Sequence, residues 1–126
     1  MRLETEAKLF VQDAIRQGRV DLVWSFVLDY ENAENPFDEQ RESIARWKEL
    51  SVHDVCVNES IRAVAKDFVK LRGIGGKDAL HLASALSVGC RFFLTTDRKF
   101  LKKSQGINEI ETVSPIVFTA IMEGFV

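Results

Sequence analysis

The stretch that decides the fold is Gly75–Leu86, GGKDALHLASAL, followed closely by Cys90–Phe100, CRFFLTTDRKF. The first part places Asp78 at the start of an apolar, alanine-rich segment that predicts a buried helix. The second part places Asp97 directly after an apolar run that predicts a strand. In a parallel sheet covered by helices, side chains at the carboxyl ends of strands gather at one edge. The two carboxylates are therefore expected to lie near each other.

The rest of the chain continues this alternation of helix and strand. Apolar residues recur at helical spacing near the N-terminus, and a near-continuous apolar run follows that predicts a strand buried on both faces. The expected helices cover residues 3–17, Glu39–Leu50, a segment opening at Asn58 with the apolar stripe Ile61, Val64, Phe68 and Leu71, then Asp78–Leu86 and Pro115–Met122. The expected strands cover Val20–Leu28, Val52–Val57, Arg91–Thr96 and Ile110–Val113. This order predicts an α/β fold with a mostly parallel sheet.

Length and composition limit the class of protein. A chain of 126 residues with 46% hydrophobic and 29% charged residues is expected to form a single globular domain over 1–126. It contains no run of about 18 apolar residues, which predicts no membrane span, and its start has no signal-peptide pattern. Cys56 and Cys90 lie in apolar stretches and are expected to be buried, reduced thiols of a cytoplasmic protein, with a disulfide as the alternative.

Charge is distributed unevenly along the chain. The net charge is −2, but residues 62–103 hold ten basic and three acidic residues, a net +7, and the remainder carries −9. A basic segment of this kind is able to attract a polyanion such as RNA. The alternative is a solvated helix face with scattered lysines.

Three acids are candidates for a site. Asp78 and Asp97 each have an ordinary alternative, since both stand where an aspartate caps a helix or meets its dipole. Glu31 follows the apolar run 20–28, with Asp29 as a competitor and a plain surface acid as the alternative. Several acids at strand ends, without a histidine cluster or paired cysteines, suit a hard cation such as Mg²⁺ or Mn²⁺. Such an ion can activate water and neutralise charge on a phosphodiester.

Other motifs point less clearly to chemistry. The run Gly73–Lys77 lacks the GxxxxGK[ST] spacing and follows a helix, so we reject a phosphate-binding loop. His81 is expected to be a hydrogen-bonded core histidine, with a ligand or base as the alternative. Trp24, Trp47 and the nine phenylalanines are expected to be core residues and not a base-stacking platform.

The motifs KDALHLASAL and FFLTTDRKFL, with VWSFVLDYEN before them, resemble PIN-domain proteins, including VapC-type toxins. The resemblance covers about Val20 to Pro115. It implies a three-layer α/β/α fold with a central parallel sheet, and a Mg²⁺- or Mn²⁺-dependent ribonuclease. By motif position it implies catalytic and metal-binding roles for Glu31, Asp78 and Asp97.

The same resemblance implies further residues and partners. Thr95 or Thr96 would orient a water or a phosphate, and the RNA backbone would be held by the basic residues Arg98, Lys99, Lys102 and Lys103. Toxin members of the family pair with an antitoxin protein, and dimers are common. The resemblance therefore implies RNA, an antitoxin and a second copy of the chain as partners.

The chain departs from the family pattern in two places. The family begins with a central strand that ends in a metal-binding Asp, whereas the first residues here predict a helix, so we expect an N-terminally truncated fold. Lys99 stands near a position where some members carry an acid. Without the first Asp, metal binding is expected to weaken. The gap in the sheet is expected to expose strand edges, which another segment or a second chain would cover.

Two alternatives to a nuclease are left open by the sequence. One is a non-catalytic PIN-like module that binds a partner or dimerises, which the missing Asp favours. The other is a phosphate-binding or response-regulator-like domain, which the order and surroundings of the acids disfavour.

Overall fold

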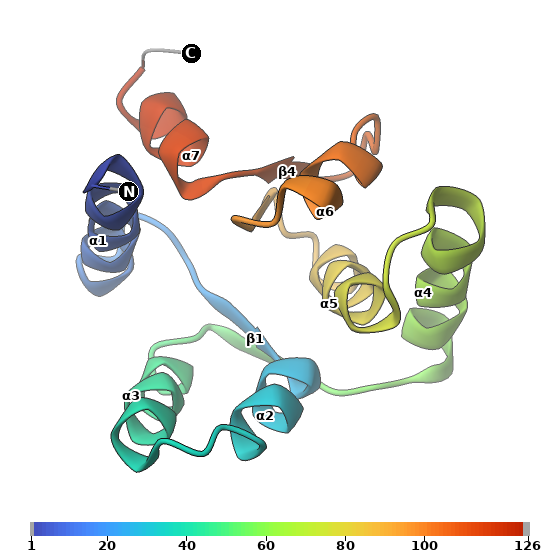
Figure 1. Cartoon of the computed structure of the whole chain (residues 1–126), viewed down its shortest axis with the longest axis horizontal. Helices are drawn as coiled ribbons and strands as arrows, with labels where there is room; N and C mark the ends of the chain where they lie inside the picture. Colours follow the sequence, from blue (N-terminus) through green and yellow to red (C-terminus); the bar gives the residue numbers. More distant parts are fainter. Residues whose placement is uncertain (1, 125–126) are drawn as a thin grey trace.

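The computed structural model of the chain describes residues 2–124, and within them it forms seven helices and four short strands (Figure 1). In chain order these are α1 (Arg2–Arg16), β1 (Val23–Ser25), α2 (Phe26–Ala33), α3 (Asp38–Lys48), β2 (His53–Val55), α4 (Glu59–Arg72), α5 (Gly76–Ser87), β3 (Phe92–Leu94), α6 (Arg98–Lys103), β4 (Glu111–Val113) and α7 (Pro115–Met122). None of the described helices is both long enough and apolar enough to span a bilayer.

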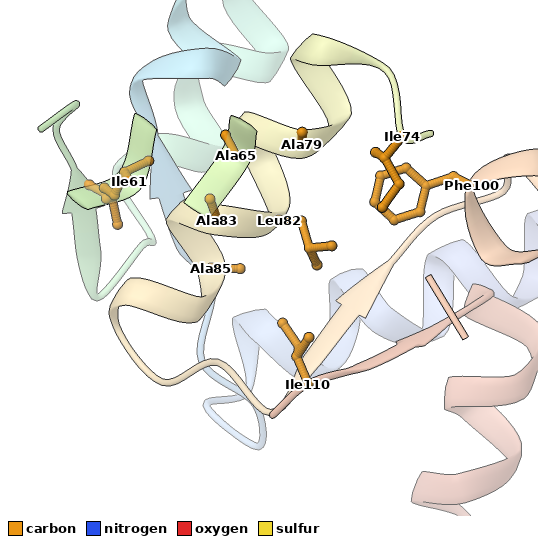
Figure 2. Packing of buried hydrophobic residues seen from close by; sticks show 10 residues of the cluster. Ile61, Ala65, Ile74, Ala79, Leu82, Ala83, Ala85, Phe100 and Ile110 are labelled. Carbon is orange, nitrogen blue, oxygen red and sulfur yellow. The ribbon is translucent and has the colours of Figure 1, made fainter. Parts of the chain in front are cut away.

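The helix α5 lies at the centre of the hydrophobic core. Most of its buried side chains are small, so α4 is able to pack closely against it, with Leu82 as the one large side chain that is fully buried. Figure 2 shows the surrounding cluster, whose labelled members are Ile61, Ala65, Ile74, Ala79, Leu82, Ala83, Ala85, Phe100 and Ile110. The stretch that was expected to decide the fold thus forms its packing centre.

The ends of these helices follow from local residues. Asn58 caps α4, because its side-chain oxygen accepts a hydrogen bond from the backbone N–H of Ile61 at 2.9 Å. The same helix ends at Gly73, whose φ of +67° is a left-handed conformation that glycine adopts without a steric penalty. Ser114 caps α7 in the same manner as Asn58, and Pro115 occupies the first turn of that helix.

The four strands form two separate parallel pairs. β1 pairs with β2, with Val23 opposite His53, and β3 pairs with β4, with Phe92 opposite Glu111. The described strands do not join into one continuous sheet, so the expected split in the sheet is present. The parallel pairs and the covering helices confirm the α/β class.

The predicted strand Val20–Leu28 is confirmed only over Val23–Ser25. The strand β1 ends at Ser25 and α2 begins at Phe26, so Glu31 lies on a helix and not in a loop after a strand. The side chain of Val27 is buried all the same. A short apolar run is compatible with either conformation, and its periodicity does not distinguish them.

Burial corrects three other expectations. On α4, Val64 and Leu71 are exposed, and the face toward α5 is formed by Ile61 and Ala65 with a half-buried Phe68. Both cysteines are free thiols, but Cys56 is exposed and Cys90 only half-buried. Among the aromatic residues expected in the core, Phe37 is 68% exposed.

Candidate active site

Asp78 lies in the first turn of α5, with its side chain half-buried. Burial raises the pKa of its carboxyl above the usual value, and the negative charges of Asp97 and Glu31 raise it further. His81 and Lys103 act in the opposite direction. Four ionisable groups from α2, α5 and the region of α6 are therefore close enough to Asp78 to affect its charge.

Asp97 lies directly after β3 and caps α6. Its Oδ1 accepts hydrogen bonds from the backbone N–H groups of Lys99 at 2.9 Å and Phe100 at 3.2 Å. The capping role considered from the sequence is therefore present, and it does not exclude a second role. A carboxylate has a further oxygen with free lone pairs, and Oδ2 takes part in neither of these hydrogen bonds.

Glu31 reaches the same place from α2. Its Oε1 lies 2.7 Å from Nε2 of His81, and the His81 side chain is only 14% exposed. The sequence correctly indicates a hydrogen-bonded histidine, but not that its partner is a candidate site acid. The spacing of residues 78 and 81 places both on the same face of the helix, but it does not indicate a partner on α2. The His81 ring also lies 6.3 Å from the ring of Phe93 on β3.

The three candidate acids thus come from three elements that meet near the carboxyl ends of β1 and β3. Their donors are carboxylate oxygens, which are the atoms that Mg²⁺ and Mn²⁺ prefer. Within residues 2–124, however, no three Asp, Glu, His or Cys side chains are arranged as a ligand set. The donor chemistry fits a hard cation, and a small number of carboxylates suffices for Mg²⁺, which keeps several of its waters.

The predicted substrate-binding residues lie beside these acids but differ in their contacts. Thr95 Oγ1 accepts a hydrogen bond from the backbone N–H of Asp97 at 3.1 Å, so this hydroxyl positions the loop. Thr96 and the predicted basic residues are exposed, and Lys103 is near enough to Asp78 to lower its pKa. The basic residues are Arg98, Lys99, Lys102 and Lys103. Their RNA-binding role stays a prediction.

One pair of residues at the site was not anticipated from the sequence. Tyr30 and Lys77 immediately precede Glu31 and Asp78, and the Lys77 Nζ lies 5.7 Å from the centre of the Tyr30 ring. The Tyr30 side chain is exposed. This cation–π contact joins α2 to the start of α5 at the rim of the acidic cluster.

Comparison with known proteins identifies one family. The family model described as PIN domain matches residues 20–105, about two thirds of the chain, a range that contains Glu31, Asp78 and Asp97. No curated protein and no solved structure matches the chain significantly.

Proposed function

The chain belongs to the PIN domain family, and from this premise we propose that it is a metal-dependent ribonuclease that cleaves RNA phosphodiester bonds. The family is generally one of metal-dependent nucleases. The observation that carries the proposal is the convergence of acids from three parts of the chain. Glu31 of α2 contacts His81 of α5 at 2.7 Å, and Asp78 lies one turn before His81 on that helix. Burial, and then the charges of Asp97 and Glu31, raise the pKa of Asp78, and a bound cation would relieve this repulsion.

Asp78 and Asp97 would hold the divalent ion, Mg²⁺ or Mn²⁺, with Glu31 beside them. When bound, such an ion supplies polarisation of a phosphoryl oxygen and neutralisation of charge. The side chains and backbone of the protein position the acids. His81 holds the Glu31 carboxylate by its hydrogen bond, and the backbone N–H groups of α6 fix the rotamer of Asp97.

Attraction of RNA would come from the basic residues on α6. An acidic site repels a phosphate backbone, so the polyanion needs cations close by. Arg98, Lys99, Lys102 and Lys103 lie on the helix that Asp97 caps. They would therefore hold the RNA backbone within one helix length of the acids.

The proposal is tested by a nuclease assay on single-stranded RNA with Mn²⁺, comparing the unaltered chain with Asp78→Asn and Asp97→Asn. Each variant is expected to lose about 100-fold or more in rate, because the ion supplies several kcal/mol of transition-state charge stabilisation. Asp67→Asn is the matched control, since Asp67 is an exposed acid on α4. Equal rates for Asp78→Asn and the control would overturn the catalytic assignment.

Metal binding is tested separately by calorimetric titration with Mn²⁺. Asp78→Ala is expected to abolish the binding heat that the unaltered chain gives. The same measurement addresses a second candidate function, a PIN-like binding or dimerisation module without catalysis. This alternative is favoured by the lack of a three-residue ligand set among residues 2–124. No binding heat with the unaltered chain would support the module.

A finer proposal is that the protein is the toxin of a toxin–antitoxin pair. It rests on the likeness of residues 77–101 to VapC-type proteins and would provide an antitoxin as partner. Induced expression is then expected to arrest growth, and Asp97→Asn to relieve the arrest. Normal growth at high expression of the active nuclease would count against a toxin.

A further inference from the structure

Tyr30, the single tyrosine of the chain, stands directly before the candidate acid Glu31 on α2. The residue is 61% exposed, and its hydroxyl has no hydrogen-bond partner among residues 2–124. An exposed aromatic ring is ordinary on a protein surface when it stands alone. What distinguishes Tyr30 is its place beside the acids and its contact with a cation.

The position of the ring is fixed from two sides. Glu31 Oε1 lies 2.7 Å from Nε2 of His81, which holds α2 against α5 at this point. Lys77 lies in the first turn of α5, and its Nζ is 5.7 Å from the centre of the Tyr30 ring. Because Tyr30 and Lys77 are the sequence neighbours of Glu31 and Asp78, the ring and the ammonium group lie next to both carboxylates.

The ammonium group of Lys77 is available to an anion. It is exposed, and no carboxylate pairs with it within the described part of the chain. A lysine of this kind is suited to a phosphate oxygen. Lys77 also belongs to the segment 62–103, which carries a net +7. A polyanion is therefore the partner that the charges favour on this side of the acids.

A nucleic acid strand offers one group for each member of this pair. Its phosphate suits the ammonium group of Lys77, and its base has a flat aromatic face that suits the ring of Tyr30. In a duplex, the faces of each base are covered by its neighbours, whereas an unpaired base is free to stack on an aromatic side chain. The pair Tyr30 and Lys77 thus selects an unpaired nucleotide.

We propose that Tyr30 stacks on an unpaired nucleobase of the RNA substrate, beside the phosphodiester at the acids, while Lys77 binds a phosphate oxygen of the same strand. This inference rests on the ribonuclease function proposed above and deepens it, because it restricts the substrate to unpaired segments of RNA. Tyr30 is then a specificity-determining residue that touches the substrate without contacting the metal ion.

The experiment measures binding of a short fluorescent single-stranded RNA by anisotropy, in a chelator, so that neither a metal ion nor cleavage contributes. Tyr30→Ala is expected to raise the Kd about 10-fold, through loss of one stacked base. Tyr30→Phe is expected to bind as the unaltered chain does, because a phenyl ring also stacks and the hydroxyl has no partner to lose. Circular dichroism checks that the variants are folded.

Phe37→Ala is the matched control. Phe37 is also an exposed aromatic residue, at 68%, but it lies on the loop between α2 and α3. Residues 34–42 around it contain four acids and one base, a net −3, which repels a phosphate backbone. This variant is therefore expected to keep the RNA affinity of the unaltered chain.

Two further measurements separate the ring from the ammonium group. Lys77→Gln is expected to reduce the slope of log affinity against log salt by about 0.7, the value for one phosphate contact on a single strand. Tyr30→Ala is expected to leave this slope unchanged. It is also expected to leave the affinity for an RNA duplex of the same sequence unchanged, because duplex bases are already stacked on one another.

A photochemical crosslink reports the stacking contact itself. On irradiation, RNA that contains 5-iodouridine reacts with aromatic side chains that stack on the modified base. Mass spectrometry is expected to find the crosslink on the peptide that contains Tyr30, which is identified without ambiguity because the chain has one tyrosine. The peptide that contains Phe37 is expected to stay unmodified.

Three results would overturn the proposal. The first is an unaltered chain that does not bind the single strand in the chelator. The second is equal affinity of Tyr30→Ala and Phe37→Ala for it. The third is a loss in Tyr30→Ala that extends equally to the duplex, which would assign the ring to holding α2 against α5.

The outcome is distinguishable from that of the nuclease assay. RNA cleavage without Tyr30-dependent binding would retain the ribonuclease and remove the stacking contact. Tyr30-dependent binding of the single strand without cleavage in Mn²⁺ would retain the stacking contact and remove the nuclease.

Discussion

Asp78 is held in a position where its charge is costly. Burial, Asp97 and Glu31 raise the pKa of its carboxyl, and only His81 and Lys103 oppose them. An enzyme site that awaits a cation has this character, because the repulsion disappears when the ion is bound. The same property makes Asp78 a measurable burden on the stability of the metal-free protein.

We therefore expect Asp78→Asn to stabilise the metal-free chain at neutral pH. A raised pKa means that the folded state binds the proton more tightly than the unfolded state, so the contribution of Asp78 to the free energy of unfolding falls as pH rises from its ordinary pKa through the raised one. Urea unfolding at several pH values in a chelator measures this. The gain in free energy of unfolding from Asp78→Asn should vanish at pH values below the ordinary pKa of an aspartate and grow above it.

Two comparisons sharpen that measurement. Asp67→Asn, on the exposed surface of α4, should leave the pH dependence unchanged. Addition of Mn²⁺ should stabilise the unaltered chain and not Asp78→Asn, because a ligand bound only by the folded state favours folding. An Asp78→Asn chain that is less stable than the unaltered chain at neutral pH would contradict this account.

At the scale of single residues, the sequence indicated the three candidate acids but not the hydrogen bonds that position their side chains. Asp78 and Asp97 were predicted as site residues from strand ends, helix starts and family likeness, and that role stays a prediction. The contact of His81 with Glu31 spans α2 and α5, and no local pattern encodes a pairing across 50 positions. The exposure of Phe37 and Cys56 was missed for a similar reason, because burial depends on which neighbours arrive from elsewhere in the chain.

At the scale of elements, α4 owes its start to one side chain. Asn58 is the cap, and its hydrogen bond to the backbone of Ile61 provides a partner for an N–H that the helix itself leaves unpaired. Asn58→Ala is expected to lower the free energy of unfolding by about 1 kcal/mol. Chemical denaturation measures the change, with Asn108→Ala, in an exposed loop position, as the control. Equal losses in both variants would argue against a capping role.

Helix ends were easier to anticipate than strand ends. Capping residues and Gly73 act within a few positions, so their signals are local. The strand predicted over Val20–Leu28 failed because only Val23–Ser25 pair with β2, while Phe26–Leu28 form the first turn of α2 and residues 20–22 lie before the strand. On α4 the apolar stripe was misplaced by the choice of face, since Ala65 packs against α5 and the larger Val64 does not.

At the scale of the whole molecule, stability is expected to be uneven. The α4–α5 pair carries most of the buried cluster, while each strand has only three residues. Hydrogen exchange should therefore be slowest in α5 and faster in β2, by about 1000-fold, because local opening needs less free energy where few apolar contacts are broken. Residue-resolved exchange by NMR checks this. Uniform protection across both elements would contradict it.

The class of fold was predictable from the sequence, and the described strands form two separate pairs. What the sequence did not indicate is that each strand pair would be so short. Three residues make few ladder hydrogen bonds, so the positions of the site acids depend on how the helices α2, α5 and α6 pack.

The contact of Glu31 with His81 joins α2 to α5, while α5 also packs against α4 in the core. A metal ion held by Glu31 and Asp78 would bind only when α2 and α5 are packed together. Thermodynamic linkage then requires that the ion stabilise this packing by the same factor by which the packing favours binding of the ion. Loss of the Glu31–His81 contact would therefore weaken metal binding without removing a carboxylate.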